Sequence, residues 1–262
     1  ETPDPEKFKG VEYLGVLKAD VDNFGKIFKN VKNATLSRYA TLSRQINNFF
    51  SIWLPYVLKT DERFENIYTI FAGGDDLFLI GPWNRIIEVA SYIRENFKRY
   101  VCENEKITLS TGISINHPSE SILFLADKTE KKLEKAKEMK GKDSISIFNV
   151  TVKWQCFSKL MKIRDEIENL FKKKVLNRAM LYRLLEVSRM AENSVRIKEK
   201  IKEGAISVDE LKCLKWPAFL KYTFARNIKE ETAKITEDVF LWIEEHKGGM
   251  IIPLYWIVYN SR

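Results

Sequence analysis

The chain has 262 residues, of which 45% are hydrophobic and 31% charged, and its formal net charge is +8. This length allows one large domain or two of ordinary size, with enough apolar residues for a buried core. No run of about 18 apolar residues occurs and no signal peptide is visible, so neither a membrane span nor secretion is expected. The three cysteines form no CxxC pair, which excludes a zinc framework and favours a reducing cytoplasm.

The positive charge is unevenly distributed along the chain. Residues 1–150 carry 22 Lys and Arg against 21 Asp and Glu, whereas residues 151–262 carry 22 against 15. A basic region can bind nucleic acid or an acidic partner, or it can simply be a solvated helical surface. Both interpretations of the second region stay open.

Strands and helices alternate through the first 150 residues, as hydrophobic periodicity and turn residues indicate. Pro55 is expected to end or kink the first helix. The expected elements are a strand at 11–19, a helix at 35–59, strands at 67–72 and 77–81, a helix at 84–101, a strand at 107–115, a helix at 119–140 and a strand at 144–148.

This β-α-β-β-α-β order, followed by α-β, predicts a ferredoxin-like sheet with a hairpin in its middle. Gly73, Gly74, Asp75 and Asp76 form the "GGDD" tip of that hairpin. The first strand should lie beside the hairpin in one antiparallel sheet. Asp20, at the end of the first strand, is therefore expected to meet the two aspartates of the tip.

From about residue 152 the strand signals fade and helical periodicity takes over. Helices are expected near 155–173, 176–201, 207–228 and 231–246, followed by an apolar tail, "MIIPLYWIVY". The predicted organisation is an α+β palm domain over residues 8–150 and a helical-bundle domain over residues 151–262.

Carboxylates gathered at one sheet edge repel one another, and a divalent cation relieves that cost. Asp and Gly are also ordinary turn residues, so either motif alone is a weak signal. Together they predict a site for Mg²⁺, which favours one or two carboxylates plus phosphate oxygens. Two such ions can activate a 3′-hydroxyl and stabilise a leaving pyrophosphate. Gly73 and Gly74, without Cβ atoms, would let a triphosphate approach the backbone.

The stretches "ADVDNFGKIF" and "FAGGDDLFLIG" resemble the second palm (cyclase-like) domain in the large subunit of type III CRISPR effector complexes. "KYTFARNIK" and the closing "PLYWIVYN" are more similar to the Csm (type III-A) subunit than to the Cmr subunit. The resemblance covers essentially the whole chain. It implies a nucleotidyltransferase that joins ATP 3′ to 5′ into cyclic oligoadenylate when the complex binds target RNA.

The resemblance also implies residue roles. Asp20 and Asp75 would be the principal ligands of two Mg²⁺ or Mn²⁺ ions and Asp76 a further carboxylate, whereas Asp22 is a weaker candidate that could be a turn residue. Ser43 is a candidate adenine contact or a surface serine. Lys137 and Lys142 are candidate triphosphate ligands or part of a solvated helix face. No side-chain nucleophile is needed, because the substrate hydroxyl attacks.

Two alternatives remain. A GGDEF-type diguanylate cyclase would use GTP, but Phe28 occupies the position of that family's guanine-reading Asn and cannot hydrogen-bond a guanine edge. A non-catalytic palm could instead bind nucleotide or RNA as a scaffold subunit.

The resemblance places the active pocket between two palm domains. One such domain is expected in this chain, so the isolated chain should be inactive or weak. No His–Asp pair occurs, so the metal nuclease domain of the full subunit is not expected here. The implied partners are the N-terminal palm and nuclease part of the subunit, other Csm subunits, and the guide and target RNAs.

Overall fold

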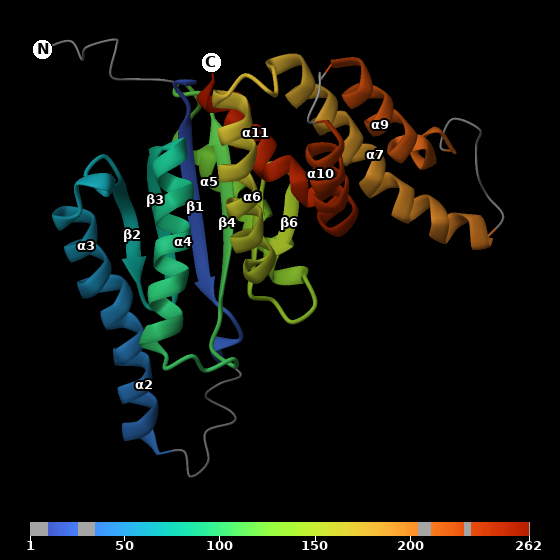
Figure 1. The fold of residues 1–262 in the computed structure, drawn as a ribbon. Coiled ribbons are helices and arrows are strands. Elements are labelled where there is room, and N and C mark those ends of the chain that lie inside the picture. Colours follow the sequence, from blue (N-terminus) through green and yellow to red (C-terminus); the bar gives the residue numbers. More distant parts are fainter. Residues whose placement is uncertain (1–9, 26–34, 204–210, 228–231, 262) are drawn as a thin grey trace, which may run out of the picture. The chain divides into compact units, whose positions relative to one another are not determined.

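The computed structural model describes residues 10–25, 35–203, 211–227 and 232–261 (Figure 1). Its contacts divide the chain into two compact units, one over residues 12–154 and the other from Gln155 onward together with the segment up to Val11. The Val11 amide donates to the Tyr259 carbonyl at 3.0 Å, which ties that segment to the second unit. The predicted boundary at residue 150 falls slightly before this division.

The first unit contains a six-stranded sheet with the strand order β2-β3-β1-β4-β5-β6. Strand β1 is antiparallel to both β3 and β4, and β5 is parallel to β4, so the predicted ferredoxin-like arrangement is confirmed. Strand β6 was not predicted; it extends the sheet where strand signals were expected to fade. The strands are β1 Leu14–Val21, β2 Tyr68–Gly73, β3 Asp76–Pro82, β4 Leu109–Asn116, β5 Ser144–Ile147 and β6 Val150–Lys153.

Helices cover both faces of the sheet, α4 (Trp83–Tyr100) on one face and α5 (Ile122–Glu138) on the other (Figure 1). A Cβ at Gly15 would lie 2.8 Å from Ile86 of α4, and one at Gly112 would lie 2.3 Å from the Leu133 nitrogen of α5. Lys18 stands opposite Gly112 in the β1–β4 register, so the even-numbered β1 residues face α5.

The predicted helix over residues 35–59 is three segments: α2 (Leu36–Asn48), a π-helix (Phe49–Trp53) and α3 (Leu54–Thr60). The helix does not end at Pro55, because α3 continues through it to Thr60. Pro55 lies in the first turn of α3, where its missing N–H costs little. The interruption is the π-helix, whose buried Phe49 packs edge-on against Phe97 of α4 with ring centroids 5.1 Å apart.

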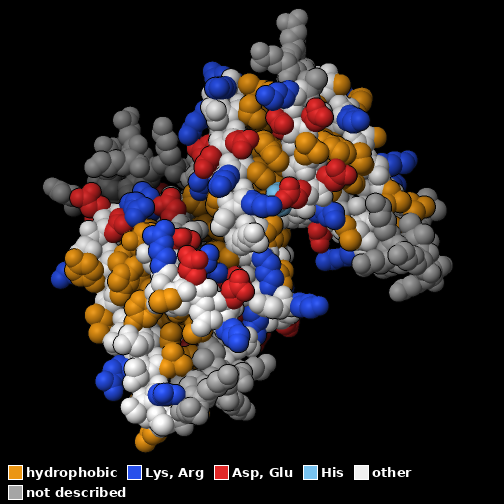
Figure 2. Space-filling view, turned by 60° about the horizontal axis from the view of Figure 1, so that its bottom comes forward, with side chains coloured by type: hydrophobic (Ala, Val, Ile, Leu, Met, Phe, Trp, Pro, Cys, Tyr) orange, Lys and Arg blue, Asp and Glu red, His pale blue; other side chains and the backbone are white. Residues whose placement is uncertain are grey.

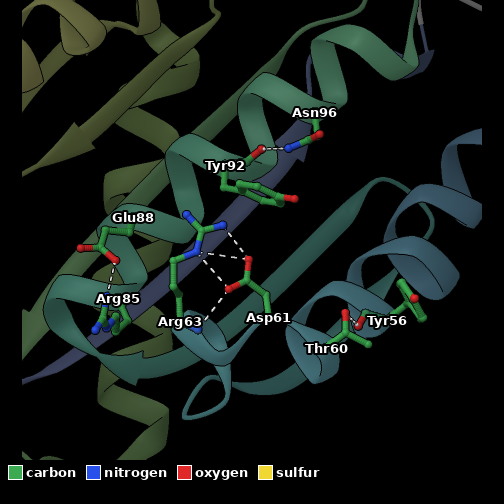
Figure 3. Close-up of polar contacts among 8 residues, drawn as sticks. All are labelled: Tyr56, Thr60, Asp61, Arg63, Arg85, Glu88, Tyr92 and Asn96. Atoms are coloured by element: carbon green, nitrogen blue, oxygen red, sulfur yellow. Dashed lines mark hydrogen bonds and ion pairs between the residues drawn. The ribbon is translucent and has the colours of Figure 1, made fainter.

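An aspartate–arginine pair holds the turn that leads from α3 into β2 (Figure 3). Arg63 donates to both carboxylate oxygens of Asp61, with Nε to Oδ1 at 2.9 Å and Nη2 to Oδ2 at 2.6 Å. Its guanidinium lies 5.5 Å from the centroid of the Tyr92 ring of α4. This pair precedes β2, so it lies at the opposite end of the hairpin strands from the tip.

The second unit is helical in the part that the structure describes, with α7 contacting α9, α10 and α11. The apolar tail forms α11, whose residues are mostly buried. None of the described helices is both long and apolar enough to cross a membrane. The helices are α6 Trp154–Lys172, α7 Arg178–Glu203, α9 Trp216–Asn227, α10 Thr232–His246 and α11 Ile251–Asn260.

The close packing of α5 on β4 gives a test of the fold. Gly112→Ala should lower the free energy of unfolding by about 2 kcal/mol or more, because the added Cβ meets backbone that cannot move away. Gly25→Ala is the matched control, since a Cβ there meets nothing within 4 Å. Urea denaturation of both variants measures the difference, and equal stability would contradict this packing.

Candidate functional site

The end of β1 and the tip of the β2–β3 hairpin meet at one edge of the sheet. Asp20 stands directly opposite Asp76 in the antiparallel register. The amide of Val21 donates to the Asp75 carbonyl at 3.1 Å. The structure therefore brings Asp20 and Asp76 to neighbouring positions, whereas Asp75 lies in the turn and joins β1 through its backbone.

Asp20 is a partly buried carboxylate in a strongly charged setting. Its side chain is 17% exposed, and its Oδ2 lies 2.8 Å from the Nζ of Lys137 on α5. Burial, with a smaller contribution from the Asp76 carboxyl, raises the pKa of Asp20 to about 6, although Lys137 acts in the opposite direction. One lysine thus compensates the negative charge incompletely, and a divalent cation would relieve the remainder.

The hairpin tip is held by a residue that the sequence reasoning missed. Gly74 adopts φ +61°, which glycine accommodates without strain, and a Cβ there would meet open space. Its amide donates to Asn47 Oδ1 at 2.8 Å, which anchors the tip to α2. The same oxygen would lie 3.6 Å from a Cβ on Gly73. Ser43 is exposed one turn before Asn47 on α2, so it lies on the same side of the helix.

The two predicted phosphate lysines occupy different local settings. Lys137 lies in the last turn of α5 and contacts Asp20. Lys142 lies in the following turn, in left-handed backbone with φ +47°. The amide of the next residue, Asp143, donates to the Asp22 carboxylate at 3.0 Å, so the Lys142 turn is joined to the end of β1 through its backbone.

Asp22 begins a turn after β1, as one of its two predicted roles requires, but its carboxylate is fully buried. Its Oδ2 accepts a 2.7 Å hydrogen bond from the Thr108 hydroxyl as well as the one from the Asp143 amide. Sequence reasoning did not identify Thr108 or Asp143, because both contacts join segments distant in the chain. Asp22 therefore connects internal parts of the structure in addition to shaping a turn.

The donor set fits a hard divalent cation that completes its shell with substrate. Asp20 and Asp76 supply carboxylate oxygens, which Mg²⁺ and Mn²⁺ prefer. Across residues 10–25, 35–203, 211–227 and 232–261, no group of three or more His, Cys, Asp or Glu side chains could hold a metal. The site therefore suits an ion held by one or two carboxylates together with phosphate oxygens, rather than an all-protein cage.

Other candidate groups have structural roles. His117 bonds to Ser119 in a loop, with Nδ1 and Oγ 2.7 Å apart. Cys156 lies 3.6 Å from His246, but burial raises the pKa of the thiol and lowers the pKa of the imidazole, so the pair is not activated for nucleophilic attack. Four tryptophans are buried in the hydrophobic core: Trp83, Trp154, Trp216 and Trp256.

Basic side chains form no separate patch on the face drawn in Figure 2, where Lys and Arg are interspersed with Asp and Glu. Within "FKKKVLNR", Lys172 pairs with Glu168 at 2.8 Å. The stretch "RNIKEETAK" lies partly outside the described residues, and Phe28 lies outside them. Binding of nucleic acid or an acidic partner by the basic second region stays a prediction.

A ferredoxin-like sheet with carboxylates at the end of its first strand and at a glycine hairpin is typical of the class of palm domains. The chain belongs to the Cas10/Cmr2 family, because the family model for the second palm domain of Cas10/Cmr2 matches residues 13–146.

Relatives of subtype III-A match beyond the palm. The CRISPR system single-strand-specific deoxyribonuclease Cas10/Csm1 of Methanocaldococcus jannaschii is 34% identical over 63% of this chain and 25% of its own length. The Enterococcus italicus protein of the same name is 30% identical over 97% of this chain and 31% of its own length. The chain thus spans about a quarter to a third of these relatives. A Csm1–Csm4 cassette crystallised with cA4 has a TM-score of 0.69 at 20% identity, over 99% of this chain and 39% of that one, which shows the fold.

The raised pKa of Asp20 predicts a pH-dependent stability. Between about pH 4 and 6 the folded chain holds a proton on Asp20 that the unfolded chain releases, so stability falls as the pH rises through this window. Relative to Asp20→Asn, the native protein should gain about 1 to 2 kcal/mol when the pH falls from about 7 to about 4.5, since solvent screens part of the full shift. Urea denaturation with a chelator present measures this, and a pH-independent difference would contradict the assignment.

Proposed function

We propose that this chain supplies the nucleotidyl-transfer palm of a type III-A effector complex, which makes cyclic oligoadenylate from ATP in a prokaryotic cytoplasm. The observation that carries the proposal is the cluster of Asp20, Asp76 and Lys137 beside the Gly73–Gly74 tip. The family membership and the cA4 bound in a related cassette support it.

In the proposed reaction, the 3′-hydroxyl of one ATP attacks the α-phosphate of another. A phosphodiester forms, pyrophosphate leaves and the hydroxyl proton passes to solvent. Two Mg²⁺ or Mn²⁺ ions would activate the hydroxyl and neutralise the leaving group. Asp20, Asp75 and Asp76 are the residues that would hold them. Positioning and charge neutralisation do most of the work in such a transfer.

The other residues have roles as substrate ligands. The open space at Gly74 leaves room for a triphosphate to approach the backbone. Lys137 would exchange Asp20 for the β- and γ-phosphates once a metal ion neutralises that carboxylate, and Lys142 would supply a second positive charge. Ser43 is proposed as an adenine contact on the side of α2 that faces the hairpin.

The site is proposed to be half of a pocket completed by the N-terminal palm of the subunit. The hairpin strand β2 is partly open to solvent, since Tyr68 is 71% exposed and Phe71 is 53% exposed. Phe71 pairs with Phe78, which stands opposite Lys18, so these aromatic side chains share the sheet face that carries Asp20. An exposed aromatic face beside the site is suited to a partner domain, and the chain alone is expected to be inactive or weak.

The remaining proposed partners are other Csm subunits and, through the complex, guide and target RNA. Two other functions stay open. A diguanylate-type cyclase would convert GTP, and a scaffold palm would bind nucleotide or RNA without chemistry. The position of Asp20 directly opposite Asp76 does not favour the scaffold function, because a simple hairpin turn does not require a second aspartate beside it.

Replacing both tip aspartates tests the catalytic role. In the complete subunit within its complex, Asp75→Ala with Asp76→Ala should reduce synthesis by roughly 100-fold or more, because metal-assisted charge neutralisation is lost. Complex assembly, followed by size-exclusion chromatography, should stay intact. Asp127→Ala, an exposed aspartate on α5, is the matched control. Undiminished synthesis would rule out the assigned role.

Product analysis separates ATP from GTP chemistry. The complete RNA-activated complex, incubated with each nucleotide separately, should yield cyclic oligoadenylate from ATP when products are identified by mass spectrometry. Cyclic di-GMP from GTP alone would establish the diguanylate alternative instead. Nucleotide binding without product would favour the scaffold function.

A further inference from the structure

We propose that Asp22 is a positioning residue that fixes the Lys142 turn to the metal-binding end of β1; this inference rests on the proposed nucleotidyl transfer. Three segments meet at the buried Asp22 carboxylate: the end of β1, the start of β4 and the turn before β5. Each contact can be followed through its hydrogen bonds.

The contact with the start of β4 is double. The Asp22 amide donates to the Thr108 carbonyl at 2.8 Å, and the Thr108 hydroxyl donates to Asp22 Oδ2 at 2.7 Å. Because Asp22 is two residues beyond Asp20, these bonds hold the backbone that carries the candidate metal ligand. The same Oδ2 accepts the Asp143 amide at 3.0 Å.

The turn that Asp22 holds has an unusual backbone. Gly141, Lys142 and Asp143 have φ of +77°, +47° and +48°, and two of these three are not glycine. L-residues rarely adopt this region unless surrounding contacts impose it. Asp22 binds the turn at the Asp143 amide, and the Lys142 amide donates to the Met139 carbonyl at 2.7 Å.

Arg94 of α4 binds the same turn from another side. Its Nε and Nη2 donate to the two Asp143 carboxylate oxygens, each at 2.9 Å, and its side chain is 14% exposed. A two-pronged guanidinium contact fixes direction as well as distance. Lys142 thus lies in a turn that Asp22 and Arg94 hold at its next residue. The backbone of Lys142 is thereby held at a fixed position relative to the backbone of Asp20.

The surroundings of Asp22 Oδ1 allow a substitution that distinguishes a positioning role from metal ligation. Asp22 Oδ1 is buried and has no hydrogen-bond partner among the described residues. Asparagine can place its NH₂ there and still present one oxygen to both donors. Asp22→Asn should therefore preserve the contact, whereas Asp22→Ala removes it. If Asp22 were instead a metal ligand, both variants would lose a charged carboxylate and both would bind Mg²⁺ more weakly.

The test uses the complete RNA-activated complex with ATP. Asp22→Ala should raise the KM for ATP about tenfold, whereas Asp22→Asn should stay within about twofold of the native KM. Arg94→Lys removes the two-bond contact with Asp143 but leaves Asp22 intact, so it should also raise the KM for ATP. This variant keeps the test decisive if Asp22→Ala does not fold. Arg63→Lys is the matched control, because it breaks a similar two-bond contact away from the hairpin tip (Figure 3).

Hydrogen exchange of the Asp143 amide supplies a readout that does not need activity. It should accelerate roughly tenfold or more in Asp22→Ala and stay slow in Asp22→Asn and Arg63→Lys. Unchanged exchange in Asp22→Ala, or an equal rise of KM in Asp22→Asn and Asp22→Ala, would overturn the proposal. Absence of any product from the native complex would refute the nucleotidyl transfer itself, while the exchange result would still decide whether Asp22 holds the turn.

Discussion

The site depends on the register of β1 between β3 and β4. That register sets Asp20 opposite Asp76 on one side and opposite Ser110 on the other. A slip of one residue would turn Asp20 to the α4 face and remove it from Lys137, because side chains alternate along a strand. Gly15 makes such a slip costly, because the slip would put a side chain where α4 packs so closely that a Cβ would lie 2.8 Å from Ile86. The hydrophobic core therefore fixes the carboxylate position.

Much of the palm could be predicted from sequence, because its signals are local. Alternating apolar residues marked most strands, and the glycines marked the hairpin, so topology alone brought Asp20 to the tip. Strand β6 was not predicted because it is short and follows a tight turn at Phe148 and Asn149, whose φ angles are +50° and +63°. The π-helix was not predicted because its aromatic residues also satisfy an α-helical period.

The supporting contacts of the site were beyond sequence reasoning for a physical reason. Asn47 binds Gly74 across 27 positions, and Asp22 binds Asp143 across 121. No local period or spacing encodes such a pair, because either residue alone is typical of a helix end or a turn. Asp22 was noticed for its charge, yet its burial follows from the three segments that close over it.

The π-helix between α2 and α3 sets how far α2 is rotated about its axis relative to α3. The Ser51 hydroxyl donates to the Asn47 carbonyl at 2.8 Å, and Asn47 Nδ2 donates to Ser51 Oγ at 3.1 Å, so these side chains link the last turn of α2 to the middle of the π-helix. Each residue added to a helix turns it by about 100°. Removing the extra residue of the π-helix would therefore rotate α2, and Asn47 with it, relative to α3 and away from Gly74. The π-helix therefore lets α2 direct Asn47 to the hairpin tip while α3 keeps its own apolar side chains buried.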